Sequence, residues 1–178
     1  SGHAVFASLD GELRALVADT GSVAWTLPGL PTDVEPLQIA HYLAIATTKD
    51  ALCLVNMADR TSNRVALAGS ARARLLSDGR TLFAVTERSI AAFTLPGLVE
   101  IWQKTVPGLG ETHAGLSGTT LVVVDDRGNV QCLEAQTGAV RWRQVEDAAL
   151  LGAPIVDGES VLLTSRPRIV RLNLADGG

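Results

Sequence analysis

The residue types that most often perform chemistry are sparse in this sequence of 178 residues. Its three histidines, His3, His41 and His113, lie far apart in the chain. A metal site or a catalytic triad would need the fold to bring such groups together, and lone histidines are more often incidental. No nucleophile elbow, phosphate-binding loop or HExxH pattern is present. We therefore predict no catalytic residue.

The run Asp125–Asn129 is the nearest approach to a metal-binding loop. It lacks the alternating acidic spacing and the closing glutamate of an EF-hand. We interpret it as a solvated turn between two strands, and we expect neither a bound metal nor a cofactor.

Charge and hydropathy exclude two classes of function. The net charge of −4 and the pI near 5.3 argue against a general nucleic-acid binder. Apolar residues make up 47% of the chain, but they occur in short runs, far below the ~20 consecutive residues that cross a bilayer. We therefore predict no membrane span.

One motif recurs five times, about 39 residues apart. Its hydrophobic runs open at positions separated by 39, 39, 39 and 40 residues: Ala4, Leu43, Leu82, Leu121 and Val161. A second landmark keeps the same step in the following run: Ala15, Cys53, Ala92, Cys132 and Arg171. Two landmarks in register indicate a repeat architecture, which decides the fold before any single element is assigned.

Each repeat is predicted to contain four short strands. In the fourth copy these are Ala114–Ser117, Leu121–Val124, Val130–Ala135 and Val140–Arg143, with polar or glycine turns between them. The Ala- and Arg-rich stretch 60–76 resembles a helix in composition, but its place in the repeat assigns it to a fourth strand and the next first strand.

Four short strands in about 40 residues are typical of a β-propeller blade. We predict an all-β fold, a β-propeller of about five four-stranded blades, possibly part of a larger propeller. The single domain 1–178 would hold repeats at approximately 3–28, 34–68, 71–106, 114–146 and 152–178.

The segments Ala15–Trp25 and Cys132–Trp142 resemble the tryptophan-docking motif of PQQ-like (quinoprotein-type) propeller repeats, with a Thr-Gly turn four residues before the tryptophan. Ala92–Trp102 is a partial copy in which Leu95-Pro96-Gly97 replaces the Thr-Gly turn. Gly152–Gly158 is similar to the first strand and turn of the same repeat.

The resemblance implies a scaffold rather than an enzyme. The family includes quinone-cofactor dehydrogenases, scaffolds of outer-membrane protein assembly and sensor domains. The dehydrogenases have more blades and an adjacent cysteine pair, which this chain lacks. We therefore predict a non-catalytic scaffold or sensor that binds a protein or small ligand on one face. The alternatives are a fragment of a PQQ-dependent quinoprotein oxidoreductase and an accessory propeller of a multidomain enzyme or kinase. The resemblance alone favours a periplasmic or other extracytoplasmic location.

The tryptophans and cysteines have structural interpretations. Trp25 and Trp142 should be mostly buried at equivalent positions between blades, stacked on turn glycines such as Gly21 and Gly138. Cys53 and Cys132 occupy a repeat position that is alanine elsewhere, so we expect small buried residues two blades apart and no disulfide.

The candidate partner-binding residues lie in or near the turns between second and third strands. These turns should share one end of the blades with the connections from blade to blade, together with Asp10 and Asp50. The mixed charge suits a protein or peptide partner. The candidate rim consists of Lys49, Glu87, Arg88, His113, Asp126, Arg127, Arg166 and Arg168.

The first copy begins at its second strand, and the fifth breaks off after its third. We expect the sequence to form part of a longer propeller, or to associate through these incomplete terminal blades, because unpaired strand edges recruit other strands. The alternative is a five-bladed ring in which the fifth copy packs on the first.

Overall fold

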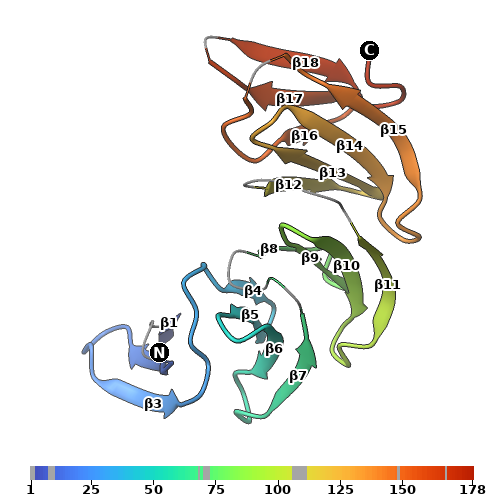
Figure 1. Ribbon diagram of the computed structural model, residues 1–178. Helices are drawn as coiled ribbons and strands as arrows, with labels where there is room; N and C mark the ends of the chain where they lie inside the picture. The colour runs from blue at the N-terminus through green and yellow to red at the C-terminus, as the bar shows by residue number, and fades with distance from the viewer. Residues whose placement is uncertain are drawn as a thin grey trace. The chain divides into compact units, whose positions relative to one another are not determined.

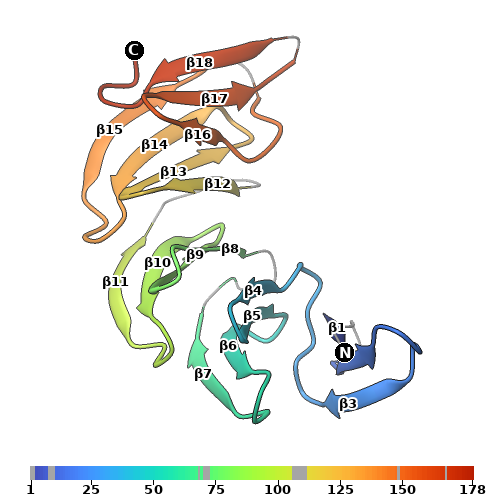
Figure 2. The ribbon, with the colours of Figure 1, turned by 180° about the vertical axis from the view of Figure 1, so that it is seen from behind.

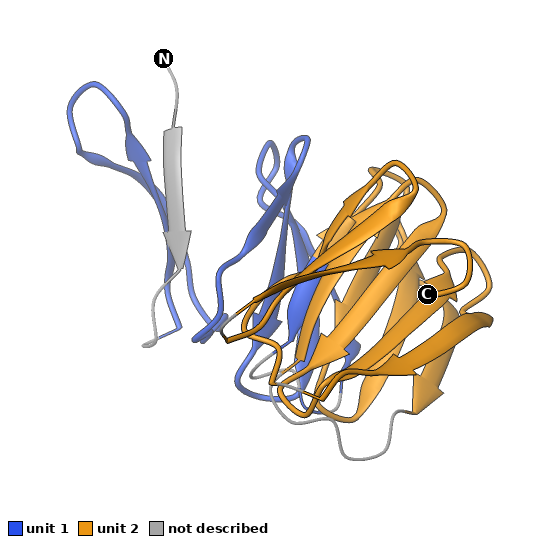
Figure 3. Cartoon of the chain, turned by 90° about the horizontal axis from the view of Figure 1, so that it is seen from above, with its two compact units in different colours: residues 1–75 blue, residues 76–178 orange. Residues whose placement is uncertain are grey.

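The computed structural model describes most of the chain. The backbone alone is described at residues 3–7, and the other described residues are 11–67, 69, 73–105, 112–147, 149–166 and 168–178. The chain divides into two compact units, Ser1–Leu75 and Leu76–Gly178 (Figure 3). That the two units form a single propeller domain stays a prediction.

Unit 1 contains two antiparallel sheets, which we call blades 1 and 2. Blade 1 has three strands in the order β1-β2-β3: His3–Ala7, Leu13–Val17 and Val23–Leu27. Blade 2 has four strands in the order β4-β5-β6-β7: Leu37–Ile39, Tyr42–Thr47, Ala51–Asn56 and Ser62–Ala66.

Unit 2 contains blades 3, 4 and 5, drawn in green, yellow to orange, and red in Figure 1. Blade 3 has β8 to β11, of which β8 crosses the unit boundary: Arg74–Ser77, Thr81–Val85, Ser89–Thr94 and Glu100–Thr105. Blade 4 has β12 to β15: Thr112–Ser117, Thr120–Asp125, Asn129–Glu134 and Val140–Val145. Blade 5 has β16 to β18: Ile155–Asp157, Ser160–Thr164 and Ile169–Asn173.

The strand predictions are confirmed. Each sheet is an antiparallel meander in sequence order, the described residues contain no helix, and the first and fifth sheets have three strands where the others have four. The stretch 60–76 contributes β7 and β8 rather than a helix.

The sheets of unit 2 pack face to face because their middle strands are apolar on both sides. All six residues of β13 are buried. Leu121 and Val123 join a core with Phe83 and Ile90 of blade 3. The alternate residues of β13, Val122 and Val124, join a second core with blade 5, which contributes Val161, Leu163 and Leu172. The strand β12 contacts both β9 and β16, and β16 is best seen from behind (Figure 2). Packing on two faces therefore requires the unbroken aliphatic run seen in the sequence.

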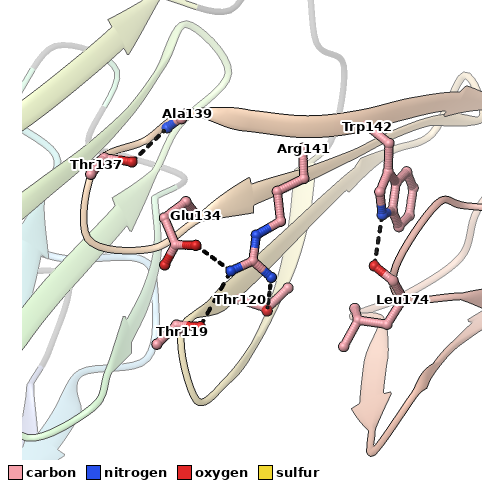
Figure 4. Close-up of polar contacts among 8 residues, drawn as sticks. All are labelled: Thr119, Thr120, Glu134, Thr137, Ala139, Arg141, Trp142 and Leu174. Carbon is pink, nitrogen blue, oxygen red and sulfur yellow. Dashed lines mark hydrogen bonds and ion pairs between the residues drawn. The ribbon is translucent and has the colours of Figure 1, made fainter.

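Tryptophans connect successive blades of unit 2. Trp142 is 8% exposed, and its Nε1 donates a hydrogen bond to the Leu174 carbonyl at 2.8 Å (Figure 4). Its ring lies so close to Gly177 that a Cβ there would be 2.8 Å away. Trp102 of blade 3 docks on blade 4 in the same way, donating to the Ala135 carbonyl at 3.0 Å and covering Gly138. The tryptophan of one blade thus docks on the turn glycine of the next blade.

One expectation about these joints is wrong in unit 1, and one is confirmed. Trp25 has the register of Trp142, since it pairs with Ala15 as Trp142 pairs with Cys132. Trp25 is partly buried and packs against the core of unit 1, as predicted for a mostly buried ring, although Trp142 is buried more completely. Gly21 adopts a φ of 69°, but among the described residues no other group lies within 4 Å of a Cβ placed there. The expected tryptophan ring is therefore not stacked on Gly21 in this structure, and its positive φ is the feature that favours glycine.

The turn before the fourth strand keeps its geometry where its glycine is missing. In each blade, one residue donates its N–H to the carbonyl four positions earlier and has a positive φ. In blades 1, 4 and 5 this residue is glycine, but blade 2 has Arg60 at φ 65° and blade 3 has Leu98 at φ 52°. Leu98, and not Gly97 of the predicted Leu-Pro-Gly substitute, therefore takes the glycine's place.

Near the turn before the fourth strand of blade 4, the Arg141 side chain connects several strands of its own sheet. Its guanidinium donates to Thr120 Oγ1 at 2.8 Å and to Thr119 Oγ1 at 3.3 Å, and it pairs with Glu134 (Figure 4). This single side chain of β15 thus bridges the β12–β13 turn and β14.

Candidate partner-binding face

A buried polar residue ends or directly follows the second strand in each of blades 2 to 5. These residues are spaced by 39, 39 and 40 positions: Thr47, Thr86, Asp125 and Ser165. The side-chain oxygen of each residue forms a hydrogen bond with the backbone of the turn that follows, and this bond holds the turn in one conformation.

Asp125 shows this role most clearly. It is fully buried, and its Oδ1 accepts N–H groups from Arg127 at 3.0 Å and Asn129 at 2.8 Å. Its Oδ2 accepts the Asn129 side-chain amide at 2.7 Å. The prediction of a solvated turn is therefore wrong for Asp125, although Asp126 and Arg127 are exposed. The carboxylate that suggested a calcium loop is already occupied by backbone donors.

The Thr86 hydroxyl also accepts hydrogen bonds from the backbone of its turn. Its Oγ1 accepts the N–H groups of Arg88 at 3.2 Å and Ser89 at 2.9 Å. Thr47 Oγ1 accepts the Lys49 N–H at a longer 3.4 Å, and Ser165 Oγ donates to the Arg168 carbonyl at 3.1 Å. The exposed side chains of these turns consequently project from backbone that is held in one conformation.

In three blades, the chain that leaves the last strand returns to the turn between the second and third strands of the repeat. Leu30 donates its N–H to the Gly11 carbonyl, Leu67 to that of Asp50, and Glu146 to that of Gly128, at 2.8 to 2.9 Å. The predicted sharing of one end by the turns and the connections between blades is confirmed for these three blades.

The structure distributes the predicted rim over both units. Lys49 is exposed in unit 1 next to Asp50, whose carboxylate accepts the Gly69 N–H at 2.8 Å. The other seven residues belong to unit 2: Glu87, Arg88, His113, Asp126, Arg127, Arg166 and Arg168. Asp10 lies outside the described residues. We call this end of unit 2 the turn face, comprising residues 86–88, 126–128, 165–166 and 168.

Hydrogen bonds and ion pairs bring several of these residues together. The Arg168 guanidinium pairs with Asp147 at 2.6 Å and approaches Glu146 at 4.0 Å, while Glu146 is bonded to the Gly128 carbonyl. The β17–β18 turn is thereby fastened to the connection from blade 4 and through it to the β13–β14 turn. His113, on β12, pairs with Val124 immediately before the β13–β14 turn and is partly buried. It therefore borders the turn face rather than projecting from it.

The remaining rim arginines have different surroundings. Arg88, Arg127 and Arg166 are exposed, and within the described part of the chain their guanidinium groups make no ion pair or hydrogen bond. Asp126 is exposed and Glu87 is partly so. The turn face therefore presents cations and carboxylates side by side on fixed backbone, which suits recognition of a charged protein surface.

Sequence reasoning missed the capping residues Thr47, Thr86, Asp125 and Ser165, although the sequence contained the signal. One hydroxyl or carboxyl residue follows every second-strand run at the repeat spacing. Only the structure shows that these side chains point inward.

Two further features lie away from the turn face. Burial raises the pKa of the Cys53 and Cys132 thiols, which are free and packed inside their blades. A groove of about 430 Å³ lies at the opposite end of blades 4 and 5, where the turn glycines are. Its lining consists of Arg141, Gly158, Glu159, Asn173, Leu174 and Ala175. Over the described residues, no cluster of three potential metal ligands occurs, and no helix suited to crossing a membrane is found.

Comparison with known proteins supports the repeat type. The sequence profile of the family described as outer membrane protein assembly factor BamB matches residues 86–178, which is more than half of the chain. The chain belongs to this family. The predicted PQQ-like propeller repeat is thereby confirmed. No curated protein sequence matches the chain significantly.

Solved structures confirm the β-propeller fold. BamB from Moraxella catarrhalis is 20% identical with a TM-score of 0.75, over 95% of this chain and 53% of that one. The computationally designed Ika8 protein is 10% identical with a TM-score of 0.79, over 100% and 57%. Kluyveromyces lactis Hsv2 is 13% identical with a TM-score of 0.68, over 99% and 58%. The chain thus spans a little over half the length of these proteins.

Proposed function

We propose that this chain is a non-catalytic scaffold that binds a protein partner through the turn face, in the assembly of outer-membrane proteins. The family match supports the assembly role, since the family is described as an outer-membrane protein assembly factor. With this role we also propose a periplasmic location.

The observation that carries the proposal is the construction of the turn face. Buried Thr86, Asp125 and Ser165 hold the backbone from below, and exposed charged side chains project from it. Fixed backbone lowers the entropy lost when a partner orders these side chains. Loops on a rigid scaffold are also where binding residues concentrate.

The test places a photo-cross-linking amino acid at Asp126 on the turn face and, as a matched control, at Asp78 in the β8–β9 turn at the opposite end. Both residues are exposed. Irradiation in the native cells should give discrete adducts with outer-membrane assembly proteins from position 126 and none from position 78. Equal yields from the two ends, or no adduct from either, would contradict the proposal.

Association through the terminal blades is a second part of the proposal. Among the described residues β18 pairs with β17 alone, and the turn after it is already formed, since Asn173 donates its N–H to the Gly178 carbonyl at 2.8 Å. An added strand fits this edge, whether from further sequence or from another chain. Ile169, which is 71% exposed beside that edge, offers the test. Light scattering of the 178-residue chain should detect association that Ile169→Lys reduces; a monomer in both cases would argue against it.

A further inference from the structure

One basic residue recurs in the turn between second and third strands at a constant spacing of 39 positions. These residues are Lys49, Arg88, Arg127 and Arg166. Lys49 belongs to unit 1, and the three arginines come from three successive blades of unit 2. All four side chains are exposed. The cation is thus a property of the repeat unit and not of one turn.

Among the described residues the guanidinium groups of the three arginines have no partner, which is also true of Arg74, Arg80 and Arg143 but not of the remaining arginines of blades 4 and 5. Arg141 is held by Glu134 and two threonines, Arg168 by Asp147, and Arg171 donates to Ser160 at 2.8 Å. By contrast, no described side chain accepts a hydrogen bond from Arg88, Arg127 or Arg166. A guanidinium group has five donors and recognises carboxylates in a two-pronged geometry. Three such groups on fixed turns are therefore available to a ligand.

The spacing of the three groups follows from blade packing. Sheets packed face to face lie about 10 Å apart, so successive turns present their arginines at steps of about 10 Å. A chain in the polyproline II conformation repeats every three residues and rises about 3.1 Å per residue, so every third side chain returns to one face after about 9.3 Å. An extended strand covers a similar length in three residues.

We propose that Arg88, Arg127 and Arg166 bind an extended segment of the protein partner that carries an acidic side chain at every third position. This inference rests on the proposed function. Each arginine then pairs with one carboxylate. Carboxylates next to the arginines, Asp126 and Glu87, disfavour a nucleic-acid ligand, because they repel a continuous row of phosphates, as does the net charge of −4.

The probe is a fluorescent nine-residue peptide of three Glu-Pro-Pro repeats, which displays its glutamates on one face. The control peptide has the same composition with its three glutamates adjacent. Anisotropy at low salt should show the repeating peptide binding about tenfold more tightly than the control, since three exposed ion pairs each contribute modestly. The difference should shrink in 0.5 M salt because exposed charges are screened.

The matched variants are R88Q/R127Q/R166Q and R74Q/R80Q/R143Q, which remove equal charge from exposed arginines. The first should abolish the preference for the repeating peptide, and the second should retain it. Equal binding of the two peptides, equal loss in the two variants, or tighter binding of a single-stranded oligonucleotide would overturn the inference. If R88Q/R127Q/R166Q still gives the cross-links from position 126, this inference fails and the proposed function stands. If no cross-link forms even in the unaltered protein, the proposed function fails.

Discussion

The joint between blades 4 and 5 and the joint between blades 1 and 2 use the same tryptophan position with different results. Trp142 is buried, hydrogen-bonded to Leu174 and stacked on Gly177. Trp25 is buried less completely and makes no hydrogen bond among the described residues, and the next blade has Arg60 at the position of the turn glycine.

The difference shows that the tryptophan alone does not make the joint. Trp25 still joins an apolar core with Leu13, Leu43 and Val55. A ring can lie flat on a turn only if the turn has no side chain, and the indole N–H then reaches the carbonyl beyond it. The aromatic ring, the glycine and the hydrogen bond form one unit, and the second blade lacks the glycine.

The largest effect is expected from removing Trp142. Trp142→Ala should lower the free energy of unfolding by about 3–5 kcal/mol, the range for a buried aromatic residue. Trp25→Ala should cost less, because that ring is less completely buried than Trp142 and makes no hydrogen bond to another described residue. Urea unfolding followed by circular dichroism measures both; equal losses would remove the distinction between the two joints.

Adding a methyl group at the turn glycine separates docking from backbone conformation. Gly177→Ala places a Cβ 2.8 Å from the Trp142 ring at a φ of 81°, so we expect a loss of about 2 kcal/mol or more. Gly21→Ala is the control, with a φ of 69° and open space around the Cβ, and should cost only the backbone term of about 1 kcal/mol. Similar thermal midpoints for the two variants would show that the ring gives way without cost.

Restoring the glycine should improve the weaker joint. A positive φ costs a residue with a side chain about 1 kcal/mol, and Arg60→Gly removes that cost from the folded state. Glycine also raises the conformational entropy of the unfolded chain, which offsets part of this gain. We expect a net stabilisation of roughly 0.5 kcal/mol, seen as a higher urea midpoint. The same change should make Trp25 less accessible to acrylamide quenching, and unchanged quenching would show that the ring does not move onto the turn.

The smallest effect concerns the two buried thiols, Cys53 and Cys132, one in each unit. Burial raises both pKa values above the ordinary value of about 8.5, so the unfolded chain loses these protons first as pH rises. Fewer protons are then bound in the unfolded state, and stability falls as pH rises above about 8.5. The Cys53→Ala/Cys132→Ala variant should show a shallower fall between pH 8 and 10. If the variant and the unaltered protein lose stability equally between pH 8 and 10, groups other than the two thiols cause the loss.

The repeat made most of the fold predictable, since the strands of blade 4 follow directly from the apolar runs and the turn glycines. The sequence could not show that Asp125 is buried, because an aspartate in a turn is usually solvated and only its hydrogen bonds to Arg127 and Asn129 reverse that expectation. It also could not show that Trp25 is buried less completely than Trp142, because burial depends on packing against the next blade, where Arg60, 35 positions away, stands in place of the turn glycine. Spacing predicts which position a residue occupies, whereas its neighbours decide what it does there.

The central claim is that the tryptophan–glycine contacts between the blades of unit 2 stabilise the strands that carry the turn face. Native-state hydrogen exchange tests this claim most directly. The account predicts that amides of β13 and β14 open with a higher free energy than those of β2 and β3, and that Trp142→Ala lowers the protection of blades 4 and 5 without altering blade 1. Equal protection of blades 1 and 4 in the unaltered protein would contradict it.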